Sequence, residues 1–299
     1  MEQETLLFDD LEDGGAGEEQ TSFTPVDPIW SESKARLIER YLHFFTFVTK
    51  HGTYFDAFAG PQRMGCDEMW SAKLVLESRP RRLRNFHLFE INPASIEALR
   101  ALRCAQPPTE ANESKRHISI HPGDCNERMP EFLASHPVKN TEAAFCLFDQ
   151  RTFECDWATV EAVARHKKGG NKIELFYFLA NGWIERAKAG KSDQDQALGK
   201  WWGGPSWREF FKLPRAERGR HFRKRFIDEL GYGYATPYPI YEKADGGKTM
   251  YWMIHATDYS KAPELMHRAY KQVLNITEVA HEVPLFDPSW GAGLKPAYD

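Results

Sequence analysis

A chain of 299 residues in which 41% of the side chains are hydrophobic and 27% are charged has enough apolar surface for a packed core, which excludes a fibrous or wholly disordered protein. No stretch approaches the roughly 18 to 20 uninterrupted apolar residues that cross a bilayer, and the first residues are acidic where a secretory signal is basic. We therefore expect a cytoplasmic protein without membrane contact.

The formal net charge of -4 is unevenly distributed along the chain. Eight acidic residues and no Lys or Arg occupy the first 19 positions, so the remainder is mildly basic. The five cysteines form no Cys-x-x-Cys pair, and the 11 histidines form no His-Glu-x-x-His motif. We therefore predict reduced thiols and no metal site.

The N-terminal part of the chain changes from a tail to a helix. Residues 1–24 combine acidic side chains with Gly-Gly-Ala-Gly, which predicts an acidic disordered tail because too little apolar surface can be buried. Residues 30–50 place apolar side chains such as Tyr41 and Phe45 at helical spacing, and Gly52 follows as a stop signal. These features predict a helix that lies on a sheet.

Strand-like apolar runs alternate with helical patterns through the middle of the chain. The strand-like runs cover residues 52–60, 85–92, 117–124, 143–150 and 172–180. The helical patterns between them cover residues 69–78, 93–102, 126–135 and 156–166. Strand, helix and strand repeated in this way predict parallel βαβ units with right-handed crossovers.

The chain after the fifth strand-like run has a different character. Residues 181–225 show no regular pattern apart from helical spacing over 221–231, so we predict an irregular, basic, Trp-rich insertion at about 181–226. Two aromatic runs then flank an Asp-Gly pair, which predicts an antiparallel hairpin over residues 235–257.

These elements together predict an α/β fold. The plan resembles the Rossmann sheet of class I methyltransferases, in which parallel strands are closed by a late antiparallel hairpin and helices cover both faces. We expect a single domain over residues 25–275 and an extended C-terminal tail over 276–299.

Small and acidic residues close the first three predicted strands. In an open parallel sheet the loops at the carboxyl ends of the strands converge on a ligand. Gly60 would let the backbone approach that ligand, Glu90 could accept hydrogen bonds from ribose hydroxyls, and Asp124 could accept the adenine amino hydrogen. No Gly-x-Gly-x-x-Gly turn is present, which favours S-adenosylmethionine over NAD. The predicted cofactor-binding residues in these loops are Asp56, Phe58, Ala59, Gly60, Glu90, Ile91, Asp124 and Cys125.

Four motifs appear in a fixed order along the chain: DAFAGP at 56–61, LFEIN at 88–92, GDCN at 123–126 and FCLFDQRTFECDW at 145–157. With them the chain resembles the three-Cys-motif partner proteins, a bacterial and phage-associated family with a methyltransferase-like fold. Trp30 and Lys34 match the N-terminal helix of that family, so the resemblance implies a cofactor-binding role for Lys34. It also implies a partner, a three-cysteine protein related to radical S-adenosylmethionine enzymes. Adenine-N6 methyltransferases acting on rRNA are a more distant resemblance.

The loop after the fourth strand departs from these families. Amino-methylating enzymes read Asp/Asn-Pro-Pro-aromatic there, and members of the partner family often read Asp-Pro-Phe-Gly, whereas this chain has Asp149, Gln150, Arg151, Thr152 and Phe153. The resemblance implies that Asp149 accepts a hydrogen from the target amine and that Phe153 stacks on the base. The cation of Arg151 lies where the methyl group must pass, which keeps a non-catalytic alternative open.

A basic segment follows the fifth strand. Nine Lys or Arg and only two Glu lie between Lys200 and Arg225, with three Trp interleaved. Cations attract phosphates and indole faces stack on unpaired bases, so the segment is a candidate nucleic-acid surface. The other interpretation is a solvated helix face with tryptophans packed on the sheet. The predicted nucleic-acid-binding residues are Trp201, Trp202, Trp207, Arg208, Arg220, Arg223, Lys224 and Arg225.

We therefore predict an S-adenosylmethionine-dependent methyltransferase-like protein that acts on a nucleic acid or nucleotide, with Asp149 and Phe153 at the acceptor side. The alternative is a non-catalytic methyltransferase-fold module that binds nucleic acid or a protein partner. A hydrolase using Glu154 and Asp156 near Asp149 is a third possibility, but the sequence offers it no metal cluster.

Overall fold

The computed structural model describes residues 29–109, 115–189, 195–243 and 246–274, so the predicted tails at 1–24 and 276–299 lie outside the described residues. The helices and strands are, in chain order, α1 (Ile29–Thr49), β1 (Gly52–Asp56), the 3₁₀ helix η2 (Asp67–Met69), α2 (Ser71–Glu77), β2 (Leu83–Glu90), α3 (Pro93–Cys104), β3 (His117–Pro122), α4 (Cys125–Ser135), β4 (Ala144–Phe148), α5 (Trp157–Ala164), β5 (Glu174–Leu179), α6 (Asn181–Ala189), α7 (Asp195–Trp202), α8 (Trp207–Lys212), α9 (Arg215–Asp228), β6 (Tyr234–Lys243), β7 (Gly246–Thr257) and α10 (Ala262–Leu274).

The strands form one sheet in the order β3, β2, β1, β4, β5, β7, β6. β1 pairs in parallel with β2 and β4, and β2 with β3 and β4 with β5 are also parallel. β7 lies antiparallel between β5 and β6. This arrangement confirms the predicted methyltransferase-like Rossmann sheet and its late antiparallel hairpin.

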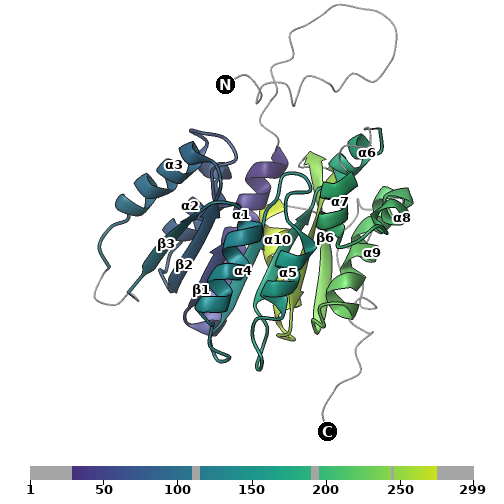
Figure 1. Cartoon of the computed structure of the whole chain (residues 1–299). Coiled ribbons are helices and arrows are strands. Elements are labelled where there is room, and N and C mark those ends of the chain that lie inside the picture. The colour runs from purple at the N-terminus through teal and green to yellow at the C-terminus, as the bar shows by residue number, and fades with distance from the viewer. Residues whose placement is uncertain (1–28, 110–114, 190–194, 244–245, 275–299) are drawn as a thin grey trace, which may run out of the picture.

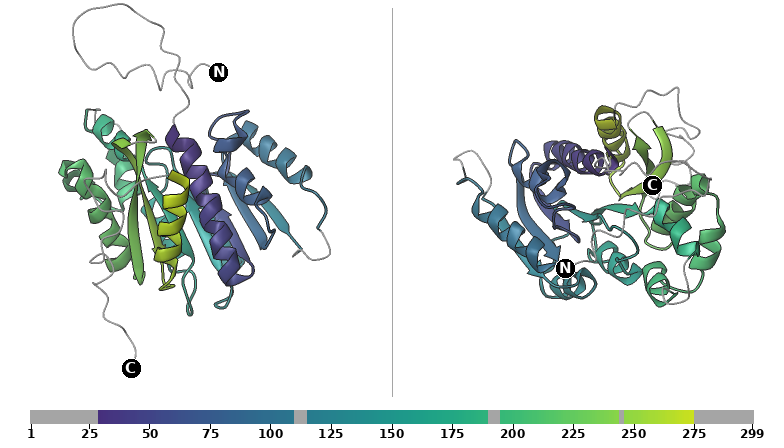
Figure 2. Two further views of the ribbon diagram at one scale, coloured as in Figure 1. Left: turned by 180° about the vertical axis from the view of Figure 1, so that it is seen from behind. Right: turned by 90° about the horizontal axis from the view of Figure 1, so that it is seen from above.

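Helices cover both faces of the sheet (Figure 1). One hydrophobic cluster joins α1, α2, α3 and α10 to the sheet, and Figure 2 shows α1 and α10 side by side on that face. The other cluster joins α4, α5 and the helices α7, α8 and α9 to the opposite face. Every residue of the central strands β1, β4 and β5 is buried, because strands covered on both faces exclude water from both.

The described residues after β5, 181–189 and 195–225, are largely helical, which corrects the prediction of an irregular segment. They contain α6, α7 and α8 and the start of α9. These helices are short and turn at Gly203 and Gly204, both with positive φ, so no single helical period runs long enough to be recognised in the sequence.

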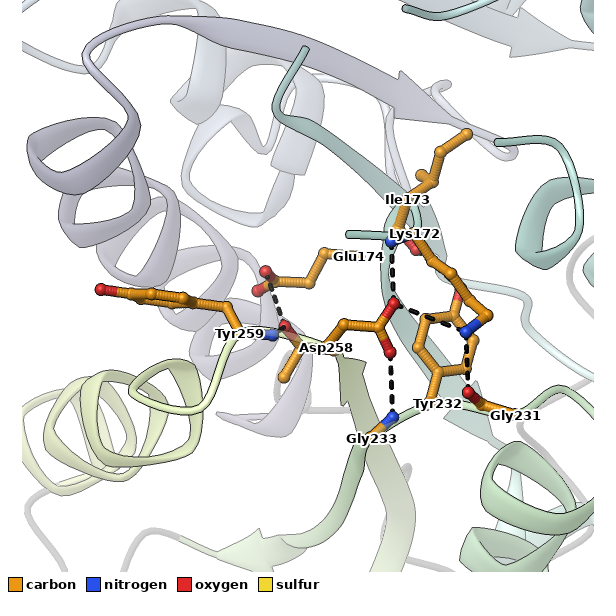
Figure 3. A network of polar contacts seen from close by, with 9 residues as sticks. Lys172, Ile173, Glu174, Gly231, Tyr232, Gly233, Asp258 and Tyr259 are labelled. Carbon is orange, nitrogen blue, oxygen red and sulfur yellow. Dashed lines mark hydrogen bonds and ion pairs between the residues drawn. The ribbon is translucent and has the colours of Figure 1, made fainter. Parts of the chain in front are cut away.

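A polar network fastens the edge of the sheet at which β5 begins (Figure 3). The Asp258 carboxylate accepts hydrogen bonds from the backbone N–H groups of Lys172 and Gly233, both at 2.9 Å. The Glu174 carboxylate accepts from Thr257 at 3.1 Å and from His255 Nε2 at 2.8 Å. The contacts hold the beginnings of β5 and β6 to the end of β7, at the edge opposite the carboxyl ends of the parallel strands.

Candidate functional site

The loop that follows β1 is held by its own polar groups. Asp56, the last residue of β1, is buried; its carboxylate accepts from the Tyr54 hydroxyl at 2.8 Å and from the backbone N–H of Phe58 at 3.1 Å. The indole N–H of Trp70 donates to the Ala59 carbonyl at 2.7 Å. The loop therefore has a fixed backbone path at the carboxyl edge of the sheet.

Gly60 and Glu90 meet although 30 positions separate them. The backbone N–H of Gly60 donates to Glu90 Oε2 at 2.7 Å, and Glu90 Oε1 accepts from the backbone N–H groups of Ile91 (2.9 Å) and Asn92 (2.8 Å). A side chain at position 60 would collide with the Glu90 carboxylate and stand 2.7 Å from the Cβ of Ser95. Glycine is therefore required by close approach, and the carboxylate joins the loops after β1 and β2.

The loop after β3 also contacts Glu90. The backbone N–H of Gly123, a residue with φ of 123°, donates to the Glu90 carbonyl at 2.9 Å. Asp124 caps α4 by accepting from the Asn126 backbone N–H at 2.9 Å. The Cys125 side chain is buried, and its burial raises the pKa of the thiol, so only the backbone of Cys125 is available to a ligand.

Two large apolar side chains are exposed at this edge. Ile91, directly after Glu90, is 66% exposed. Of the four large hydrophobic side chains that are exposed in the described part of the chain, Phe47 and Val48 lie at the end of α1, whereas Met64 and Ile91 lie in loops at the carboxyl edge.

A small hollow opens between the ends of β1 and β4. Its empty volume is about 200 Å³, and it is lined by Asp56, Phe58, Ala59, Gly60, Gln62, Trp70, Ser71, Ala72, Leu147 and Asp149. The hollow includes Gly60 but neither Glu90 nor Asp124, which lie on the neighbouring loops. Two carboxylates line it, and this composition suits a ligand that carries an amino group or another positive charge.

A buried ion pair forms part of the hollow. Lys34 of α1 places its Nζ 2.5 Å from Asp149 Oδ1, and both side chains are almost fully buried. The second oxygen of Asp149 accepts from Gln62 Nε2 at 3.1 Å. The same ammonium lies 4.8 Å from the centre of the Phe178 ring and 4.3 Å from that of Tyr251. The structure therefore pairs Lys34 with Asp149. The resemblance implied cofactor binding for Lys34 and contact with the acceptor for Asp149.

Burial changes the acidity of the other carboxyl group in the hollow. Loss of hydration raises the pKa of Asp56 from 3.8 to about 7, against the lowering effect of the hydrogen bonds from Tyr54 and Phe58; the negative charges of Asp149 and Glu90 raise it further. Asp56 is therefore the group in the hollow that changes its charge near neutral pH.

The loop between β4 and α5 is ordered without the prolines of the amino-methylating motif. Gln150 is fully buried, donates to the Phe178 carbonyl at 3.2 Å and accepts from the Cys155 backbone N–H at 3.0 Å. Arg151 Nη2 donates to the carbonyl of Gln62 at 3.2 Å and so reaches the β1 loop. Hydrogen bonds thus hold this loop in place of proline rings.

Phe153 packs against aromatic side chains of α7 and α8. Its ring centre lies 4.8 Å from that of Trp201 and 5.7 Å from that of Phe211. These contacts bury the ring in part and do not support the predicted stacking role of Phe153.

Three of the eight predicted nucleic-acid-binding residues are buried: Trp201, Trp202 and Arg225. Trp201 is fully buried, stacks on Phe222 at 6.0 Å, and neighbours the buried Trp202. Trp207 is partly buried against Phe211. The prediction that Trp201 and Trp202 stack on bases is therefore wrong, because their rings already fill the core.

The basic residues of this segment divide into two groups. Arg225 is buried, lies 3.7 Å over the Trp157 ring and pairs with Glu229 at 2.7 Å, so it holds helices together. Arg208 pairs with Asp195 at 2.5 Å, and Arg223 donates to the Ala235 carbonyl at 2.7 Å. The exposed members on α9 are Arg220 and Lys224.

Five residues that line the hollow were missed by sequence reasoning: Gln62, Trp70, Ser71, Ala72 and Leu147. Gln62 stands two positions after Gly60, and its place in the same loop was a usable signal. Trp70 reaches Ala59 from the end of η2, and nothing in the local pattern indicates that contact.

Two further findings concern the residues that the structure describes. They contain no group of three or more His, Cys, Asp or Glu side chains placed to hold a metal ion. None of their helices has the length and hydropathy of a membrane span.

The similarity of this chain to known proteins is one of fold only. No family model and no curated protein matches the chain. Among solved structures, it is similar to the plantazolicin methyltransferase BamL in complex with a triazolic desmethylPZN analog and SAH (12% identity, 83% of this chain and 76% of that chain, TM-score 0.40). It is also similar to LPL1258 from Legionella pneumophila (10%, 83% and 92%, TM-score 0.46) and to M. jannaschii TYW2 in complex with AdoMet (10%, 79% and 77%, TM-score 0.33). The class of protein, one with a class I methyltransferase-like fold, follows from the strand order of this chain itself.

Proposed function

We propose that this protein binds S-adenosylmethionine at the carboxyl edge of its sheet and transfers the methyl group to a nucleic acid or nucleotide. The observation that carries the proposal is the junction of Gly60, Glu90 and the exposed Ile91, next to a hollow lined by Asp56 and Asp149. Three loops that are distant in sequence supply these groups at the place where open α/β sheets bind ligands.

The residues fit the two ends of the cofactor. Ile91 offers an uncovered apolar surface for adenine, and Glu90 Oε2, with one amide donor, retains capacity for a ribose hydroxyl. Asp56 suits the methionyl ammonium. The hollow lies at the ends of β1 and β4, so it would take the methionyl end while the adenosine lies along the edge past Ile91.

When bound, the cofactor would supply an activated methyl group, and the chain would mainly contribute alignment. Lys34 and Gln62 fix the Asp149 carboxylate at the end of β4, so that Asp149 orients the acceptor nucleophile. The exposed Arg220 and Lys224 are the cations that support a nucleic-acid acceptor. The four ordered motifs support membership of the three-Cys-motif partner family and contact with its three-cysteine protein. The proposal also includes a cytoplasmic location.

A second candidate is a non-catalytic methyltransferase-fold module that binds nucleic acid or a protein partner. The observation that favours it is that both oxygens of Asp149 already accept hydrogen bonds, from Lys34 and Gln62. A carboxylate engaged in this way is a weak acceptor for an incoming amine.

Titration calorimetry of the full chain with S-adenosylmethionine tests the cofactor assignment. We expect the wild-type protein to bind and Ile91→Ser to bind roughly 10- to 100-fold more weakly, because covering an Ile side chain contributes about 1.5 to 3 kcal/mol. Phe47→Ser is the matched control, since Phe47 is also an exposed apolar residue, 47% exposed, but lies at the end of α1. Absence of binding by the wild-type chain would remove the cofactor from the proposal.

Turnover separates the two candidates. Transfer of a labelled methyl group to an RNA or DNA oligonucleotide would exclude the non-catalytic module. Salt-sensitive oligonucleotide binding by a chain that has no cofactor affinity would favour it.

A further inference from the structure

A cation stands at the rim of the hollow and is not used by the proposed cofactor site. Arg151 is exposed, and its Nη2 donates to the carbonyl oxygens of Gln62 at 3.2 Å and Pro61 at 3.5 Å. In the part of the chain that the structure describes, its guanidinium contacts no carboxylate. Its Nε and Nη1 donors are therefore available to a ligand.

The backbone holds this guanidinium in place. Glu154 Oε2 accepts from the backbone N–H groups of Arg151 at 2.7 Å and Thr152 at 3.1 Å, and the buried Gln150 anchors the preceding position. Gln62, whose carbonyl Arg151 contacts, in turn donates to Asp149. The cation is thus preorganised beside the carboxylate at which we place the acceptor.

The charges around the hollow determine where an anion could bind. Asp56 and Asp149 make the interior unfavourable for an anion, and Lys34 is already paired there. The rim is different, because it carries Arg151, whose guanidinium donates to the Gln62 carbonyl. Among the described residues this cationic fork contacts no carboxylate, so it matches a phosphate group.

We propose that Arg151 binds a phosphate group of the acceptor substrate, and that the acceptor is therefore a phosphate ester, either a free nucleotide or one within a strand. This inference rests on the proposed function, because the phosphate ester is a methyl acceptor only if the protein transfers a methyl group. Arginine suits this role because its planar donors match phosphate oxygens in pairs. Arg151 then selects the substrate, and its contacts with Pro61 and Gln62 orient the fork.

Binding measurements on the full chain test the assignment without requiring turnover. The probes are the four ribonucleoside 5′-monophosphates, the matching nucleosides, and mixed-sequence single-stranded RNA and DNA oligonucleotides, each titrated with and without S-adenosylmethionine. We expect Arg151→Gln to weaken binding of the phosphate-bearing probes on the order of 10- to 100-fold and to leave the nucleosides unchanged. Arg151→Lys should restore part of the affinity, because it keeps the charge and loses the fork.

Arg165→Gln is the matched control. Arg165 is also exposed and donates to a backbone carbonyl, that of Glu229 at 3.1 Å. It differs from Arg151 in pairing with the Glu161 carboxylate at 3.1 Å and in lying at the end of α5. This variant should bind every probe as the wild type does.

The outcomes distinguish a free nucleotide from a nucleic-acid strand, and some of them would overturn the inference. Binding of mononucleotides indicates a free nucleotide, and binding of oligonucleotides alone indicates a strand. Equal losses for nucleosides and nucleotides, no change with Arg151→Gln, or no binding of any phosphate-bearing probe by the wild type would overturn the inference. If Arg151→Gln weakens only the binding of S-adenosylmethionine, then Arg151 acts only by holding the β1 loop, and the inference is also overturned. Absence of cofactor binding with phosphate binding intact would overturn the proposed function and leave the anion site.

Discussion

At the scale of the residue, the buried carboxyl group of Asp56 links stability to pH. Its pKa of about 7 in the folded chain lies above its ordinary value of 3.8, so the folded state holds a proton that the unfolded state has lost between these values. Its stabilising contribution is complete below about pH 4 and is lost as the pH rises to about 7. We expect the free energy of unfolding of the wild type, relative to Asp56→Asn, to fall across this window. Urea unfolding at several pH values measures the difference, and parallel curves for the two proteins would contradict it.

The same proton should govern cofactor binding. A neutral Asp56 attracts an ammonium group less than an ionised one, so the affinity of the wild type for S-adenosylmethionine should rise between pH 6 and pH 8. Asp56→Asn, which cannot ionise, should show weaker binding with little dependence on pH. Calorimetry at pH 6, 7 and 8 checks this, and an equal slope in both proteins would assign the titration to another group.

At the scale of the element, α9 is held to α5 and α7 by a basic residue that sequence reasoning placed on the surface. Arg225 lies over the rings of Trp157 at 3.7 Å and Trp202 at 4.2 Å. Arg225→Ala should lower the free energy of unfolding by about 2 kcal/mol, because a desolvated cation over aromatic rings and the packing of its stem are both lost. Lys224→Ala, one position earlier and exposed, should change stability by less than about 0.5 kcal/mol. Equal stabilities in urea unfolding would show that the Arg225 contact is not stabilising.

At the scale of the whole molecule, the carboxyl ends and the amino ends of the parallel strands carry different features. The carboxyl edge carries the candidate site, and the opposite edge carries the network around Asp258 (Figure 3). Asp258→Ala leaves the N–H groups of Lys172 and Gly233 without this acceptor, so stability should fall by about 1 to 3 kcal/mol while cofactor affinity at a temperature of full folding stays unchanged. Asp228→Ala, at the exposed end of α9, is the control. A loss of affinity without a loss of stability would show that the two edges are coupled.

The sequence by itself determined the seven strands, the helices between the five parallel strands and the closing hairpin. Alternation of apolar runs with helical spacing is a local property, and short right-handed crossovers leave little choice of topology. The meeting of the loops at Gly60, Glu90 and Gly123 followed from the same rule, because parallel strands bring their carboxyl ends to one edge.

Only the tertiary structure decided which polar and aromatic groups are used inside the fold. Lys34 and Asp149 are 115 positions apart, and no local pattern pairs them. Trp201 and Arg225 lie in a segment whose composition equally suits a nucleic-acid surface, and their burial depends on how four short helices pack on one face. Composition records the chemistry that a side chain offers, whereas its partner is set by packing between elements that are distant in the chain.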